Sequence, residues 1–327
     1  MGATHIQAMT SVPGAVLAAV AARNEKALSG DLSEAGGNLD RGAAVVDFSG
    51  VAKFHDWRAM ITTSDVEAVD ICLPTEFHCE ATLLALEHGK HVLVEKPMAL
   101  TAAECSEMLA AAHRAGKTLM VAHVLRFWPE YLELRRSIDN GGLGAVRRAI
   151  FERLCGLPDW SKWLTDSARS GGAIVDLLIH DVDQAIALFG LPQEVECRSV
   201  GAVDTIEAVL FYSSGLEVRI RGGWYPSGTP FSMGFEIEGT RGTMKLEGGR
   251  LEVKNSAEAR NTASGWEPVT VPKGDGYESE IAYFVDCCRE GRAPSRCLPE
   301  DSARAVQLSI LLRQARLEEG RRLPCIV

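Results

Sequence analysis

Polar residues and prolines follow two apolar segments, ICLPTEFH (71–78) and HVLVEKP (91–97), in which strands are expected to end. Ligands of parallel sheets bind at the carboxyl ends of the strands. We therefore expect a ligand rim formed by Pro74, Thr75, His78, Glu95 and Lys96. The alternative for Lys96 is an exposed lysine at a strand end. Its place between a glutamate and a proline after an apolar strand favours the rim.

A second polar group lies in SGGAIVDLLIHDVDQAIALFG (170–190), whose spacing predicts one long helix over 171–189. Asp176 and His180 are four residues apart and would share one face of that helix. A carboxylate and an imidazole on a half-buried helix cost free energy unless they serve a purpose. An imidazole, with an ordinary pKa of about 6.5, suits acid–base chemistry. The alternative is a hydrogen-bonded pair that only orients packing, and Asp183 is expected in such a structural role.

The elements that must position these residues change in kind near residue 125. Before it, strands alternate with helices, which predicts right-handed βαβ units and a parallel sheet. Strands are expected at 16–23, 66–75, 91–97 and 118–127, a short strand and a helical turn at 52–62, and helices at 81–90 and 101–117. After it, turn-linked strand patterns predict an antiparallel sheet of hairpins. Two further helices close the chain, at 277–291 and 300–320.

Composition limits the class of protein. The chain has 327 residues, enough for two domains, and its net charge of -10 disfavours nucleic acid as a partner. Its nine cysteines are odd in number and form no C-x-x-C pair, so we expect neither a disulfide framework nor a metal site. Free thiols indicate a cytoplasmic protein. No apolar run approaches the length of a membrane span, so we expect no membrane partner.

The motifs LPTEFH, GKHVLVEKP, HVLRFWPEY and GGAIVDLLIHDVD together resemble the glucose–fructose oxidoreductase, inositol dehydrogenase and MocA (Gfo/Idh/MocA) family of NAD(P)-dependent oxidoreductases. The resemblance covers nearly the whole chain. It implies an α/β fold, with a Rossmann-like doubly wound parallel sheet in a dinucleotide-binding domain at residues 1–122. It also implies an α+β domain at residues 123–327, with a large, mainly antiparallel open sheet for substrate binding and oligomerisation. The C-terminal helix is expected to pack back on the first domain.

The amino end of the chain fits only the tail of a glycine-rich cofactor loop. Gly2 and His5 match the end of that loop in the family, while its first strand and first two glycines are not in the chain. We expect Met1 to be an internal methionine of a longer natural protein. The alternative is a genuine truncation, which would remove a central strand and the pyrophosphate cradle.

The resemblance also implies a cofactor. Ala22 stands where the family often has the aspartate that binds the ribose, and Arg23 follows it, so NADP is favoured over NAD. The alternative for Arg23 is stacking on adenine, which serves either cofactor. Trp163 stands where the family often has a Trp-Arg pair, with Leu164 in place of the arginine. The cofactor contacts that we expect are Gly2, His5, Arg23, Leu73, Pro74, Thr75, His78, Glu95, Lys96 and Trp163.

By the same resemblance, Lys96, Asp176 and His180 are the catalytic residues around a sugar or polyol. His180 suits proton transfer, Lys96 suits stabilising an alkoxide, and Asp176 suits orienting His180 or a substrate hydroxyl. Which of Lys96 and His180 carries the proton stays open. Arg126 matches a recurrent family arginine, with a substrate-binding or a structural role. A homodimer or homotetramer through the second-domain sheet is expected, because its strands carry apolar residues that a monomer would expose.

Two other functions stay open at this point. One is a non-catalytic binding or scaffold protein that no longer binds cofactor because the first strand is lost. The other is a glycoside hydrolase that uses tightly held NAD for transient oxidation, as some relatives do.

Overall fold

The computed structural model describes residues 1–34, 36, 45–201, 203–255 and 265–326. Its contacts group into two compact units. The first is Met1–Phe127 with Gly274–Ala303, and the second is Trp128–Lys273 with Arg304–Val327. The first unit is therefore formed by two separate stretches of the chain. The predicted division into residues 1–122 and 123–327 gives each domain one continuous stretch instead. Among the described residues, no helix has the length and apolar character needed to cross a membrane.

The first unit is built on parallel strands, as predicted from the alternation of strand and helix. They are β1 (Ala19–Ala21), β2 (Ala52–Phe54), β3 (Ala68–Ile71), β4 (His91–Glu95) and β5 (Leu119–Ala122). β1 pairs with β2, and a second sheet has the order β3-β4-β5. β5 is buried at every position and β4 at all but its first. Continuous burial of this kind is typical of parallel strands with both faces covered.

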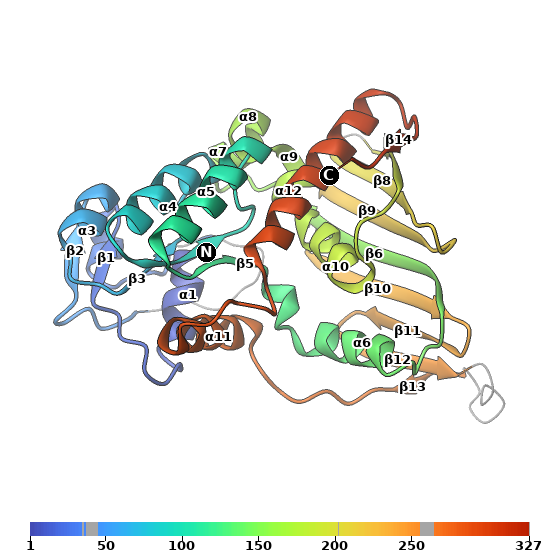
Figure 1. Ribbon diagram of the computed structural model, residues 1–327, viewed down its shortest axis with the longest axis horizontal. Helices are drawn as coiled ribbons and strands as arrows, with labels where there is room; N and C mark the ends of the chain where they lie inside the picture. Colours follow the sequence, from blue (N-terminus) through green and yellow to red (C-terminus); the bar gives the residue numbers. More distant parts are fainter. Residues whose placement is uncertain (35, 37–44, 202, 256–264, 327) are drawn as a thin grey trace. The chain divides into compact units, whose positions relative to one another are not determined.

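Helices cover both faces of these strands. They are α1 (Gly2–Met9), α2 (Glu25–Leu28), α3 (Trp57–Thr63), α4 (His78–Glu87), α5 (Ala102–Ala115) and α11 (Gly276–Glu290), with 3-10 turns η1 (Thr75–Phe77) and η2 (Val124–Arg126). α4 and α5 lie on one side, and α1 and α11 pack together on the other (Figure 1). The predicted capping box starts α5, since the Glu104 amide donates to Thr101 Oγ1 and the Thr101 amide donates to Glu104 Oε2.

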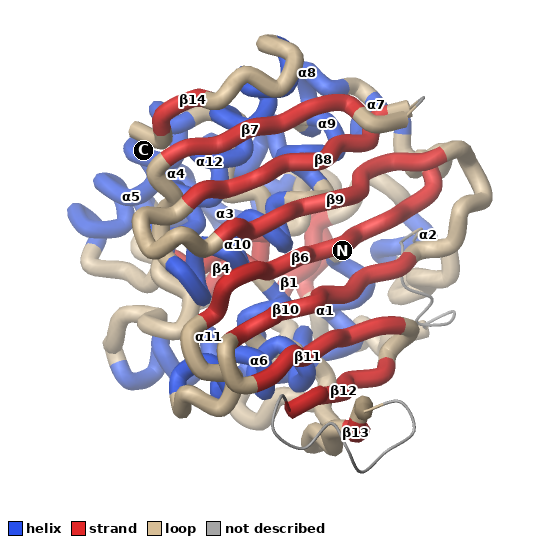
Figure 2. Tube along the Cα trace, turned by 90° about the vertical axis from the view of Figure 1, so that its right-hand side faces the viewer, coloured by secondary structure: helices blue, strands red, loops and turns tan. Residues whose placement is uncertain are grey.

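The second unit is a nine-stranded sheet with the order β13-β12-β11-β10-β6-β9-β8-β7-β14 (Figure 2). Its strands are β6 (Val146–Gly156), β7 (Glu194–Ser199), β8 (Asp204–Phe211), β9 (Glu217–Tyr225), β10 (Ser232–Gly239), β11 (Gly242–Glu247), β12 (Arg250–Asn255), β13 (Glu267–Pro268) and β14 (Leu323–Pro324). The expectation of a large, mainly antiparallel sheet is confirmed. The exception is the central pair of β6 and β9, which is parallel.

The helices of the second unit differ from the prediction, because three of them were not expected and the long helix is divided. They are α6 (Pro129–Asp139), α7 (Lys162–Thr165), α8 (Ser167–Ser170), α9 (Gly172–Asp176) and α10 (Ile179–Phe189), and α12 (Pro299–Leu317) continues into it from the first unit. α6, α7 and α8 were not expected. The single helix expected over 171–189 is wrong, because α9 ends at Asp176 and α10 begins at Ile179, with turn residues at Leu177 and Leu178 between them. The Leu178 amide donates to the Ala173 carbonyl five residues back, which inserts one extra residue into the turn.

The two faces of the sheet differ in chemistry. Trp224 is 3% exposed and packs with Cys155 of β6 against Ala173 and Leu177, so this face meets the helices. No described helix lies in front of the opposite face in Figure 2. Glu207 of β8 lies on that face, where it contacts Arg198, Arg219 and Arg221. The uncovered face is therefore lined by ion pairs, in contrast to the apolar residues expected from the sequence.

Candidate active site

Lys96 occupies the carboxyl end of β4 in the first unit and is half-buried. Its backbone amide donates to Oε2 of Glu95 at 2.9 Å, and Glu95 is only 6% exposed. Pro97, which follows, offers its carbonyl oxygen to Nδ1 of His78 at 2.8 Å. The other ring nitrogen of His78 lies 2.8 Å from the carbonyl oxygen of Leu73. Burial lowers the pKa of His78, so the neutral ring donates one hydrogen bond, to the carbonyl oxygen of Pro97 or to that of Leu73, between the ends of β3 and β4.

Glu95 is held in turn by a buried histidine of α1. Nδ1 of His5 lies 2.9 Å from Asp70 Oδ2, and its Nε2 lies 3.1 Å from Glu95 Oε1, as an ion-pair contact without the angle of a hydrogen bond. The His5 side chain is 1% exposed, against 20% for Asp70 and 7% for Glu95. The carboxylates of Asp70 and Glu95 thus flank the imidazole of His5, and Glu95 directly precedes Lys96, the expected catalytic lysine.

Burial and charge set the protonation of this trio. Burial alone would lower the pKa of His5, but the charge of Asp70 and hydrogen bonds with Asp70 and Cys72 raise it well above its usual value. Burial alone would raise the pKa of Glu95, but the contact with His5 and the charges of His5, Lys96 and the amino terminus lower it to about 2. The trio is therefore an imidazolium between two carboxylates.

Cys72 completes a group with metal-ligand chemistry. The donor atoms of His5, Asp70 and Cys72 all lie within 4.8 Å of one another. Burial and the charge of Asp70 raise the pKa of Cys72 to about 11, so its sulfur is a thiol at neutral pH. An imidazolium and a thiol both carry the proton that a metal would have to replace. With His5 and Cys72 both protonated, these residues form an ion pair between His5 and Asp70 with a neighbouring thiol, rather than a set of metal ligands.

The remaining rim residues of the first unit lie at strand ends. Pro74 precedes η1, and Thr75 is 3% exposed. A Cβ on Gly2 would lie 3.6 Å from the Cβ of Cys72, which places the amino end of α1 beside the end of β3. Arg23 lies beyond Ala22, which follows β1, and is exposed, with Asn24 capping α2 behind it.

Arg126 is buried against its own unit. Its Nη1 donates to the carbonyl oxygen of Arg296 at 3.1 Å and lies 3.4 Å from Asp301 Oδ2. The side chain is 7% exposed. These contacts hold η2 against the segment that starts α12.

In the second unit, Asp176 and His180 stand on either side of the break between α9 and α10, and both are half-buried. They therefore do not share one continuous helix, because the extra residue of the turn lies between them. Asp204 of β8 fixes the start of α9, since its Oδ2 accepts a hydrogen bond from the Ala173 amide at 2.8 Å. A Cβ on Gly172 would come within 3.0 Å of that oxygen, and φ of Gly172 is +76°. Glycine is required there for α9 to begin against β8.

An ion pair that sequence reasoning missed fixes α10. Arg153 of β6 donates to Asp181 through Nε at 2.8 Å and Nη2 at 3.1 Å, and the two side chains are 3% and 0% exposed. Because Asp181 follows His180, this fork fixes the first turn of the helix that carries His180. Phe151, Arg153 and Cys155 are two residues apart along β6 and are all buried, so they share the covered face of the strand. This period-2 pattern could have indicated from the sequence that Arg153 is buried.

Trp163, the cofactor contact expected from the second unit, lies in the one-turn helix α7 and is half-buried. The structure thus brings His5, Leu73, His78, Glu95 and Lys96 together at the ends of β3 and β4. It places Arg23 at the end of β1, in the other sheet of the first unit. Asp176, His180 and Trp163 belong to the second unit.

Comparison with known proteins agrees with this organisation. Residues 1–123 match the oxidoreductase family with an NAD-binding Rossmann fold, and residues 131–245 match the GFO/IDH/MocA C-terminal domain. D-Glucoside 3-dehydrogenase of Escherichia coli (strain K12) is 35% identical over 149 residues, which are 44% of this chain and 42% of that enzyme. The scyllo-inositol 2-dehydrogenase (NADP(+)) IolU of Bacillus subtilis (strain 168) is 27% identical over 295 residues, 82% of each protein.

The fold has a solved counterpart along its whole length. Levoglucosan dehydrogenase, in complex with NADH and levoglucosan, aligns with a TM-score of 0.83 at 20% identity, over 99% of this chain and 95% of that one. At that identity the likeness concerns the fold. The two domain matches follow one another in chain order and span most of the sequence. The chain belongs to the Gfo/Idh/MocA family of NAD(P)-dependent oxidoreductases.

Proposed function

We propose that the protein catalyses hydride transfer between a nicotinamide cofactor and a carbinol or carbonyl of a sugar or polyol. The observation that carries the proposal is the setting of Lys96, a half-buried lysine at the carboxyl end of β4, anchored through Glu95 on the buried imidazolium of His5. Family membership supports the reaction type. The names of the relatives, which refer to a glucoside and to scyllo-inositol, support the substrate class.

The residues at the strand ends fit a dinucleotide. Arg23, Thr75 and Lys96 follow three parallel strands of the first unit, and such ends are where dinucleotides bind. When bound, the nicotinamide accepts or supplies the hydride. The exposed guanidinium of Arg23 would pair with a 2′-phosphate, and Ala22 leaves no carboxylate to repel it. This supports NADP as the preferred cofactor.

The chain's own residues would handle the proton and the charge. Oxidation of a carbinol releases a hydride from carbon and a proton from oxygen. His180 takes that proton, and in the reverse direction returns it. The Lys96 ammonium donates a hydrogen bond to the same oxygen and stabilises its negative charge. Asp176 orients His180 or accepts a hydrogen bond from a substrate hydroxyl.

The surroundings of the enzyme are part of the proposal. All nine cysteines are free thiols, which supports a reducing compartment such as the cytoplasm. The face of the nine-stranded sheet that no described helix covers supports self-association into a homodimer or homotetramer. Light scattering tests this assembly, and the mass of a single chain would contradict it.

The test is a panel of sugars and polyols assayed with NAD and NADP by nicotinamide absorbance. Lys96→Met and His180→Ala should each lower turnover by roughly 10²–10⁴-fold on the best substrate. Lys53→Met and His113→Ala, exposed residues of the same types in the first unit, serve as matched controls and should keep turnover. Sugar binding without turnover by any member of the panel would favour a non-catalytic binding protein and contradict the proposal.

A further inference from the structure

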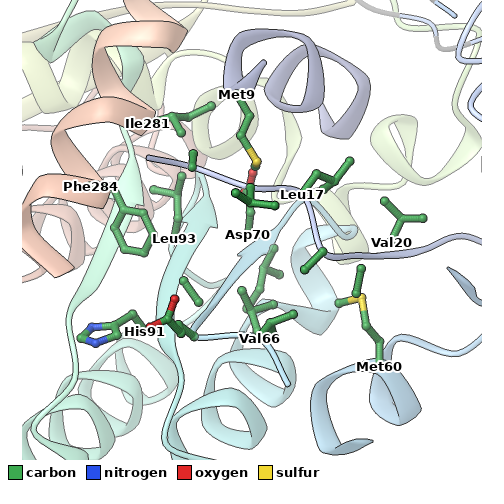
Figure 3. Close-up of a pocket in the computed structure, with 18 of the residues that line it drawn as sticks. Met9, Leu17, Val20, Met60, Val66, Asp70, His91, Leu93, Ile281 and Phe284 are labelled. Carbon is green, nitrogen blue, oxygen red and sulfur yellow. The ribbon is translucent and has the colours of Figure 1, made fainter. Parts of the chain in front are cut away.

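A cavity of about 550 Å³ in the first unit has mainly apolar walls (Figure 3). Of the lining side chains labelled in the figure, only Asp70 and His91 are polar. Both have partners, since Asp70 contacts His5 and Nδ1 of His91 accepts a hydrogen bond from the Thr118 amide at 3.0 Å. These walls do not match the hydroxyl groups of a sugar.

A smaller cavity, of about 230 Å³, is lined by residues of the second unit alone. It lies between the start of α6 and the strands β10 and β11, and we call it the ring pocket. Its lining includes the aromatic rings of Trp128 and Phe231, the carboxylate of Glu130 and the thioether of Met233. Pockets for whole drug-sized ligands have about 300–1,000 Å³, so the ring pocket suits one ring of a larger ligand.

The side chains of the ring pocket match the two kinds of surface that a sugar ring presents. Trp128 and Phe231 are half-buried, and an aromatic face packs against the C–H groups of a sugar ring. Oε2 of Glu130 is buried and accepts no hydrogen bond from the described residues, which costs free energy. The terminal torsion of a glutamate is soft, so this acceptor can turn toward a hydroxyl in the pocket.

Phe231 connects the ring pocket to α9. It packs against the buried cluster that contains Cys155 and Leu177, and Leu177 directly follows Asp176. Burial and, after it, the charge of Asp176 raise the pKa of the Cys155 thiol, which indicates that the carboxylate lies close to this cluster. One wall of the ring pocket is therefore also a neighbour of the turn that carries Asp176.

Met233 connects the ring pocket to α10. Nη1 of Arg153 donates to the sulfur of Met233 at 3.5 Å, and the same guanidinium holds Asp181, the residue after His180. The ring pocket thus shares a wall residue with the support of each proposed proton-handling residue of the second unit. A substrate that reacts at Asp176 and His180 can extend from there into the ring pocket.

We propose that the ring pocket is a subsite for a second sugar ring, so that the preferred substrate is a disaccharide or another glycoside. This inference rests on the proposed function, because it takes the reacting ring to be oxidised at Asp176 and His180. The second ring packs on Phe231 and Trp128, and one of its hydroxyls donates a hydrogen bond to Glu130. A free monosaccharide or polyol leaves this subsite empty.

The test compares substrates that share the reacting ring and differ in the second one. Matched pairs are maltose with methyl α-glucoside, cellobiose with methyl β-glucoside and lactose with methyl β-galactoside. The best disaccharide should have a KM at least tenfold below that of its methyl glycoside. Glu130→Gln and Phe231→Leu should each raise KM for the disaccharide about 5–20-fold, with kcat and the KM of the methyl glycoside nearly unchanged.

The substitutions are chosen to leave the fold intact. Leucine at position 231 keeps an apolar contact with the cluster beside α9 and removes only the aromatic face. The matched controls are Glu133→Gln, which lies one turn further along α6 and pairs with Arg136, and Phe189→Leu at the end of α10. Neither residue lines the ring pocket, so both controls should keep the KM of both substrates.

Three results would overturn the proposal. They are equal KM values for the disaccharides and their methyl glycosides, an unchanged KM for the disaccharide in both variants, and an equal rise in KM for both substrates. The last would show that the two residues act only through the structure around α9.

Calorimetry with the disaccharides separates this inference from the proposed function, because it does not depend on turnover. Disaccharide binding that Glu130→Gln weakens, without oxidation of any sugar, would support the subsite and contradict the proposed chemistry. Oxidation of the methyl glycosides with no binding or oxidation of a disaccharide would support the chemistry and overturn the subsite.

Discussion

Replacing His5 by leucine should destabilise the first unit severely, because it leaves Glu95 buried without its cation. Leucine keeps much of the ring's volume, so the loss is mainly electrostatic. The pKa of Glu95 is about 2, against an ordinary 4.5, and at about 1.4 kcal/mol per pKa unit this corresponds to about 3 kcal/mol. Lys96 and the amino terminus share in it, while breaking a buried pair typically costs about 3–5 kcal/mol. We expect His5→Leu to lose about 2–4 kcal/mol of unfolding free energy at pH 6.

The loss should depend on pH in a defined direction. Glu95 has a lowered pKa, so its stabilising contribution is present above about pH 4.5 and lost as the pH falls toward about 2. His5 has a raised pKa, so its contribution is complete below about pH 6.5 and lost as the pH rises through the folded-state value. The difference between wild type and His5→Leu should therefore be largest between about pH 4.5 and 6.5.

Urea unfolding at pH 5.5, 7 and 9 measures this difference, and His55→Leu is the control. His55 lies 3.1 Å from Glu25, the same distance as in the buried pair, but the two side chains are 63% and 83% exposed. Its replacement should leave stability close to that of wild type, because exposed ion pairs contribute little. A loss in His5→Leu no larger than in His55→Leu, or one that is constant with pH, would refute the reasoning.

The remaining predictions concern both units. Arg153→Met should cost about 3–5 kcal/mol in urea unfolding by leaving Asp181 buried and unpaired, and Arg153→Met with Asp181→Leu should recover most of that loss; a double variant no more stable than the single would contradict it. Arg23→Ala should weaken NADP binding by about 1.5–3 kcal/mol more than NAD binding in calorimetry, and Ala22→Asp should shift preference toward NAD; an unchanged ratio would exclude the ribose assignment. Gly172→Ala should lower stability by about 1–3 kcal/mol, since its φ is +76°, and should lower turnover through α9; a fully stable, fully active variant would show that α9 is not fixed there.

Much of the fold followed from local patterns. The alternation of strands and helices, the capping box at Thr101 and the turn-linked strands each rest on residues a few positions apart. α6 also had a local signal that went unused, namely Pro129 at its first turn.

The contacts that build the candidate site are long-range, which is why sequence patterns did not reveal them. His5 meets an aspartate 65 residues away, and Arg153 meets one 28 residues away. At the break after Asp176, the amides of Leu177 and Leu178 both donate to the Ala173 carbonyl, a pattern that the periodicity of the apolar residues does not encode.

Transfer of deuterium from the carbinol carbon of a labelled substrate to the nicotinamide tests the central claim most directly. With the best substrate of the panel, the label should appear in the reduced cofactor. Its rate of appearance should fall by roughly 10²–10⁴-fold in His180→Ala, while dinucleotide binding in calorimetry is retained. Lys96→Met should also lose deuterium transfer. Because Lys96 borders the expected nicotinamide position, we expect this variant to bind the dinucleotide more weakly as well, so retained binding is measured on His180→Ala alone. Label that stays in the substrate, or transfer at a near-normal rate in His180→Ala, would contradict the proposed chemistry.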